Sequence, residues 1–144
     1  MCVPVSDEMD ELAALMLAQV LNREGANAYV ASSRRLTEIL ASVSADKPNL
    51  AVLCGLPPFA VARSQRLYRS LRARNPQLKI MVGIFNYSDD VSEVAQAFGE
   101  KEEVSILTGL SQAVLEICKA PSKDESTPAV ADAPSESLPD KSAA

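Results

Sequence analysis

The sequence predicts an α/β fold in which helices cover both faces of a parallel sheet. Short apolar stretches alternate with longer stretches of helical periodicity along most of the chain. The stretches AVLC and IMVGIF contain no polar residue, which is typical of strands that are buried on both faces. These two observations together predict a three-layer α/β sandwich.

The amino-terminal part of the chain contains two strand and helix pairs. Residues 2–5 are a short apolar strand, and residues 8–24 follow with the periodicity of a helix that Gly25 ends. Residues 28–31 are a second apolar strand, and residues 34–43 have helical spacing.

Three further pairs follow. We expect strands at residues 50–54, 79–85 and 104–107, and helices at residues 60–75, 89–98 and 111–119. Gly55 and the Pro57-Pro58 pair end the first of these strands, while Pro76 and Pro121 stop the first and last helices because proline has no amide hydrogen. Five pairs in about 119 residues match a five-stranded flavodoxin-like sheet of order 2-1-3-4-5.

The composition separates one domain from a tail. Residues 120–144 hold six Ala, five Ser, four Pro and a single Leu, with five acidic residues against two Lys. Such a segment buries too little apolar surface to offset the entropy of ordering, so we expect a disordered acidic tail. The folded domain is predicted at residues 1–119.

The composition also excludes several functions. The 144 residues include no His, which removes imidazole acid-base chemistry, Ser-His-Asp triads and His-ligated metals. A net charge of -5 disfavours nucleic-acid binding. Three Cys without a CxxC pair indicate buried thiols in a reducing compartment. Since no apolar stretch is long enough to span a bilayer, we expect a cytoplasmic protein. Because the sequence lacks these catalytic groupings, we expect that it is not an enzyme.

In the predicted strand order a ligand crevice opens at the carboxyl ends of the first and third strands. The candidate ligand-binding residues there are Asp7, Met9, Gly55, Leu56, Phe59 and Gly83. The acidic cluster at residues 6–11 is interpreted as a helix cap, which disfavours a phosphate at that helix start. A cation held by Asp7 and Asp10 is a weaker alternative, and we predict no metal site. Aspartyl-phosphate chemistry is excluded because Cys54 stands where a receiver domain has its aspartate.

Two helices are candidates for contact with partners. Residues 60–75 carry a basic face made by Arg63, Arg66, Arg69 and Arg72, which is either solvated or docks on an acidic partner or on anionic lipid headgroups. Residues 12–21 are apolar nearly all round except for Gln19. That helix is either a deeply packed crossover or half of a homodimer interface.

The sequence also resembles a known family. The stretches that carry the resemblance are CVPVSDEMDELAALMLAQVL and LAVLCGLPPFAVARSQRLYRSLRARNPQLKIMVG. They are similar to the soluble C-terminal domain of some bacterial membrane transporters of the autoinducer-2 exporter family, also called PurR-regulated permease-like transporters. The resemblance implies a non-catalytic regulatory or interaction domain on the cytosolic side of a transporter, of which this chain is a fragment or a stand-alone relative. Membrane association would then come only through a partner or a missing upstream segment.

That appended domain is in turn similar to cobalamin-binding domains. At the positions of their DxHxxG motif this chain has Asp7, Met9 and Leu12, so the cobalt-ligating His and the Gly are both replaced. Of the later Ser-x-Leu motif only Leu56 is kept, and of the later Gly-Gly pair only Gly83 is kept. The resemblance therefore implies the fold without a cofactor, and the alternative function is a corrinoid-like small-molecule sensor that lacks a cobalt ligand.

Overall fold

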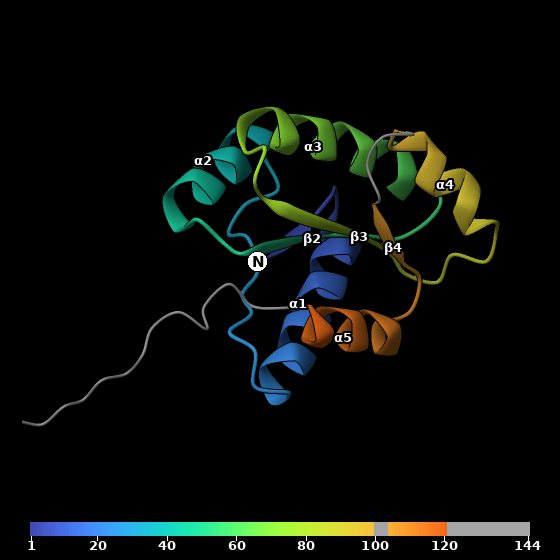
Figure 1. Cartoon of the computed structure of the whole chain (residues 1–144), viewed down its shortest axis with the longest axis horizontal. Helices are drawn as coiled ribbons and strands as arrows, with labels where there is room; N and C mark the ends of the chain where they lie inside the picture. The colour runs from blue at the N-terminus through green and yellow to red at the C-terminus, as the bar shows by residue number, and fades with distance from the viewer. Residues whose placement is uncertain (100–103, 121–144) are drawn as a thin grey trace, which may run out of the picture.

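The computed structural model describes residues 1–99 and 104–120 (Figure 1). The elements in chain order are β1 (Cys2–Pro4), α1 (Glu8–Arg23), α2 (Leu36–Asp46), β2 (Leu50–Gly55), α3 (Ala60–Arg74), β3 (Lys79–Ile84), α4 (Val91–Ala97), β4 (Ser105–Leu107) and α5 (Leu110–Lys119).

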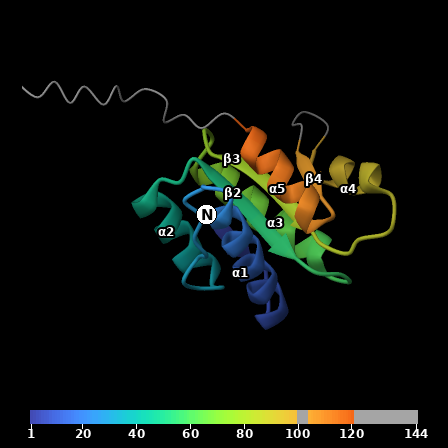
Figure 2. The same ribbon diagram turned by 90° about the horizontal axis from the view of Figure 1, so that it is seen from below.

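The four strands form one parallel sheet in the order β1-β2-β3-β4. Helices α2, α3 and α4 cover one face of the sheet, and α1 and α5 cover the other (Figures 1 and 2). Alternate residues of β2 enter opposite cores, since Leu53 packs beneath α2 and α3 while Val52 and Cys54 pack against α1 and α5. The predicted α/β fold with a parallel sheet covered on both faces is confirmed.

The predicted second strand at residues 28–31 is reduced to a single bridge, so the described sheet has four strands rather than five. The bridge joins Val30 to Cys2 on the outer side of β1. A longer ladder does not form because Pro4, which would stand opposite Ser32 in this register, has no amide hydrogen to donate. The Asn22 side chain holds the main-chain groups of Ala28. It accepts a hydrogen bond from the Ala28 amide at 2.7 Å and donates one to the Ala28 carbonyl at 2.8 Å.

Helix α2 begins two residues later and ends three residues later than predicted. Arg35 has extended backbone, and its amide donates to the Ser33 hydroxyl at 3.1 Å, so the chain turns before the helix starts. The helix stops where Lys47 adopts a left-handed conformation with φ of 46°.

The cysteines differ from the prediction at one position. Cys2 and Cys54 are buried as expected, but Cys118 is exposed on α5. Among the described residues, no helix is long and apolar enough to cross a membrane. The tail predicted at residues 120–144 lies, apart from Ala120, outside the described residues.

Candidate functional site

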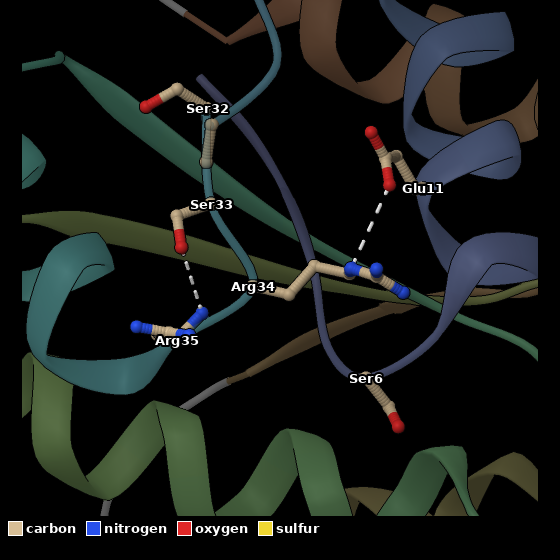
Figure 3. Close-up of a pocket in the computed structure, with 7 residues that line it drawn as sticks. Ser6, Glu11, Ser32, Ser33, Arg34 and Arg35 are labelled. Atoms are coloured by element: carbon tan, nitrogen blue, oxygen red, sulfur yellow. Dashed lines mark hydrogen bonds and ion pairs between the residues drawn. The ribbon is translucent and has the colours of Figure 1, made fainter.

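Two adjoining pockets lie at the carboxyl end of β1. The first has a volume of about 480 Å³ (Figure 3) and is lined by Ser6, Glu11, Ala31, Ser32, Ser33, Arg34 and Arg35. The second has a volume of about 390 Å³ and is lined by Val5, Ser6, Arg34, Leu36, Ile39, Arg63, Arg66 and Leu67. Because Ser6 and Arg34 line both, we treat the two pockets as one feature and call it the carboxyl-edge groove.

Three separate segments build the groove. The loop that leaves β1 supplies Ser6, the segment between the Val30 bridge and α2 supplies residues 31–35, and the first turns of α3 supply Arg63 and Arg66. The strands are parallel, so their carboxyl ends all reach this edge of the sheet and the segments that follow them meet there. The fold therefore gathers hydroxyl and guanidinium groups that are far apart in the sequence.

Arg34 extends across the first pocket toward α1 (Figure 3). Its Nε lies 3.7 Å from the Glu11 carboxylate, and the two side chains are 39% and 46% exposed. An ion pair this exposed contributes little to stability. A guanidinium has five N–H donors, so one such contact leaves donors of Arg34 for a ligand.

Arg63 organises the second pocket. Its Nη1 donates a hydrogen bond to the Ser6 hydroxyl and lies 3.8 Å from a carboxylate oxygen of Asp7. Its guanidinium carbon also lies 5.5 Å from the centre of the Phe59 ring, within the range of a cation–π contact. Arg63 thus joins two of the predicted ligand-binding residues, Asp7 and Phe59, to the loop after β1.

The two helices that begin beside the groove differ at their first turns. At the start of α1, the Asp7 carboxylate accepts hydrogen bonds from the amides of Met9 and Asp10, each at 3.1 Å. At the start of α2, Arg35 is the N-cap residue and makes no side-chain cap hydrogen bond. An anion at the groove would be favoured by the α2 amides, whereas the α1 amides are already occupied by a carboxylate.

Asp10 closes the space between α1 and the loop after β2. The residue is only 2% exposed, and its carboxylate accepts hydrogen bonds from the Leu56 amide at 2.9 Å and from the Asp7 amide at 3.4 Å. Burial raises the pKa of Asp10 and the nearby charge of Asp7 adds to this, while the hydrogen bond from Leu56 opposes it. The carboxylate is therefore a link between two segments of the fold.

The alternative of a cation held by Asp7 and Asp10 receives no support from this arrangement. Oxygens of both carboxylates accept hydrogen bonds from main-chain amides. Among the residues that the structure describes, no cluster of three or more Asp, Glu, Cys or His side chains could hold a metal ion.

None of the six predicted ligand-binding residues lines the carboxyl-edge groove, although the amides of Leu56 and Asp7 both donate to the Asp10 carboxylate. Met9 is 58% exposed on the outer side of α1, and Leu56 is partly buried against the core beneath α1 and α5. A Cβ atom at Gly83 would lie 2.8 Å from the Phe85 ring. Gly83 thus allows that ring to pack on the sheet.

Gly55 has a similar packing role. A Cβ atom there would lie 2.7 Å from a methyl group of Val5 and 2.9 Å from the Cβ of Ala60. The missing side chain lets β2 end directly between the end of β1 and the start of α3.

The basic face predicted on α3 is divided between three environments. Arg63 and Arg66 line the groove, and Arg69 is exposed. Arg72 binds within its own part of the fold, donating to the carbonyls of Pro76 at 3.0 Å and Leu78 at 2.8 Å. It therefore anchors the turn that connects α3 to β3.

This division leads to a prediction about stability. Arg72→Ala should lower the free energy of unfolding by about 1 to 2 kcal/mol because the carbonyls of Pro76 and Leu78, in the turn after α3, lose a charged donor. Arg69→Ala, a change of the same kind at an exposed position, should alter it by no more than about 0.5 kcal/mol. Urea denaturation of both variants measures the difference, and equal values would contradict the anchoring role of Arg72.

Sequence reasoning missed the run Ser32, Ser33, Arg34 and Arg35, because it assigned Arg34 and Arg35 to the predicted helix at residues 34–43 and gave the two serines no role. The signal was present, because these residues follow the predicted second strand and that strand ends at the same edge as the first. Hydroxyl and guanidinium groups at the carboxyl end of a parallel strand indicate a candidate anion site.

Comparison with known proteins adds no further information about this groove, since the chain matches no protein-family model and no curated protein.

Proposed function

We propose that this chain is a non-catalytic regulatory domain that binds a small molecule bearing a phosphate or carboxylate group in the carboxyl-edge groove. The observation that carries the proposal is the meeting of Arg34, Arg35, Arg63 and Arg66 around one continuous groove. Guanidinium groups bind carboxylates and phosphates through paired, charge-assisted hydrogen bonds. Hydroxyl groups of Ser6, Ser32 and Ser33 add further donors.

The groove residues favour binding over catalysis. The carboxylate among them, Glu11, is already paired with Arg34. The serines lie in a chain without His, so a general base of the usual kind is missing beside them. The groove therefore offers hydrogen-bond donors for an anion but no activated nucleophile, which supports reversible binding of a ligand without a chemical reaction.

We further infer that the sheet is a flavodoxin-like arrangement of order 2-1-3-4-5 in which the second strand is reduced to the Val30 bridge. The resemblance to the appended domain of autoinducer-2 exporter family transporters supports a regulatory role beside a membrane transporter. In that role the occupancy of the groove would be the signal that the domain passes to its partner. We assign no corrinoid to the groove, because Met9 and Leu12 lie exposed on α1.

Thermal unfolding with two probe anions tests the binding proposal. Inorganic phosphate and succinate are each added to the full chain, with sodium chloride at matched ionic strength as the reference. A ligand that binds only the folded state stabilises it, by about 2.7 kcal/mol at 100 times its Kd. We expect at least one of the two anions to raise the Tm above the chloride reference.

The variants locate the effect. Arg34→Ala should weaken binding of that anion about tenfold or more, because a charge-assisted hydrogen bond contributes about 1.5 to 3 kcal/mol. Arg74→Ala removes an exposed arginine from the other end of α3 and should leave binding unchanged. Equal Tm values in phosphate, succinate and chloride would contradict the proposal, as would equal losses in the two variants.

A further inference from the structure

Helix α1 presents large apolar side chains to solvent. Met9, Leu12, Leu15 and Met16 are 58%, 49%, 51% and 49% exposed, and we call them the α1 outer stripe. The opposite side of the same helix packs on the sheet through Ala14, Leu17 and Leu21. A surface helix normally carries polar residues on its outer side, so a contiguous apolar stripe there indicates an interaction surface.

Figure 2 views the molecule from the side on which α1 and α5 lie, and α1 runs across this side. Its first turn is acidic, with Glu8 exposed, and its last turn is basic, with Arg23 exposed. Neither residue forms an ion pair within the part of the chain that the structure describes. The helix therefore has a negative end, an apolar middle and a positive end.

Two copies of α1 with this pattern are complementary when they lie antiparallel, because the negative end of each helix then faces the positive end of the other. If two α1 helices lie antiparallel about a twofold axis between Leu15 and Met16, Leu15 of one copy faces Met16 of the other. The same arrangement places Leu12 opposite Gln19 and Glu8 opposite Arg23. A twofold interface makes each of these contacts twice, and antiparallel helix dipoles add a favourable term.

We infer that two copies of this chain associate through the α1 outer stripe in this antiparallel arrangement, with Glu8 of each copy beside Arg23 of the other. The charges favour a second copy over an anionic membrane surface, which attracts helices with basic polar faces. Helix α1 has three acidic residues in its first turn and a single basic residue in its last turn. The inference is independent of the groove and of the ligand proposed for it.

Light scattering during gel filtration of the full chain tests the association. The chain has a mass of 15.4 kDa, and we expect a species of twice that mass whose proportion rises with concentration. Leu15→Glu combined with Met16→Glu should raise the dissociation constant about 100-fold or more, because each copy loses two buried apolar contacts. Leu115→Glu, at a 59% exposed position on α5, is the matched control and should leave the mass unchanged.

A charge exchange tests the antiparallel pairing with variants that keep the apolar stripe. Glu8→Arg or Arg23→Glu alone should weaken the dimer several-fold, because each places like charges together, and the two changes combined should restore it. Circular dichroism confirms that each variant is folded. A wild-type chain that stays monomeric at all concentrations would overturn the inference, and so would a combined exchange that restores nothing or a Leu115→Glu variant that dissociates as well.

Discussion

Gly55→Ala is expected to lower the free energy of unfolding by about 2 to 3 kcal/mol. The added methyl group would lie 2.7 Å from a Val5 methyl group and 2.9 Å from the Cβ of Ala60. Both neighbours are short side chains fixed to the main chain, so relief of the overlap requires a shift of β1, β2 or the start of α3. The same shift would disturb the loop that carries Ser6 into the groove. Urea denaturation measures the change in stability.

Gly109→Ala is the matched control for this variant. A Cβ atom at Gly109 meets nothing within 4 Å, and neither Gly55 nor Gly109 has a positive φ. The entropic gain from replacing glycine in the unfolded chain is then the same at both positions. We expect Gly109→Ala to cost no more than about 1 kcal/mol, because Gly109 is the N-cap residue of α5 and alanine is less favourable there. A Gly55→Ala variant as stable as the Gly109→Ala variant would refute the close packing at the end of β2.

Asp10→Ala is expected to cost about 2 kcal/mol of stability. The substitution removes the acceptor of the Leu56 amide and breaks the reciprocal hydrogen bonds that begin α1. Asp10 and Leu56 are 46 positions apart in the sequence, so the bond is a tertiary link rather than a local cap. Glu8→Ala, in the same turn but exposed, is the control and should change stability much less.

The pH dependence of stability gives a second test of Asp10. Burial raises the pKa of Asp10, so the folded state holds this proton more tightly than the unfolded state. The resulting stabilisation is fully present below the unfolded pKa and is lost as the pH rises through the folded pKa. Asp10→Asn cannot titrate. Between about pH 4 and about pH 8, the wild type should therefore lose stability relative to this variant; a relative gain would contradict the environment of Asp10.

The sheet and its flanking helices could be predicted because their signal is local. The uninterrupted apolar runs in β2 and β3 are typical of strands that are buried on both faces. Prolines in the sequence mark where α3 and α5 end. The strand expected at residues 28–31 has a similar apolar signal. It fails to extend because Pro4, which would stand opposite Ser32 in that register, has no amide hydrogen to donate. Pairing at a sheet edge thus depends on which residue the neighbouring strand places there.

Less of the candidate site than of the fold could be predicted from the sequence. A helix cap within residues 6–11 follows from the place of this cluster before an apolar helix, and the structure shows that Asp7 is the capping residue. The link from Asp10 to Leu56 depends on how β2 lies beside α1, which no local pattern encodes. Four of the five arginines of α3 were predicted as one face from their spacing, yet Arg72 donates to carbonyls beyond the helix end. Periodicity places a residue on a helix, but the neighbouring loop determines what its side chain contacts.

Titration of the isotopically labelled full chain with inorganic phosphate and succinate, followed through backbone amide chemical shifts, tests the proposed anion site most directly. We expect saturable shifts for at least one anion that are largest at residues 32–38 and at Ser6, where the serine hydroxyls, Arg34 and the first amides of α2 meet. Shifts that do not saturate, or that centre away from the carboxyl-edge groove, would contradict the account.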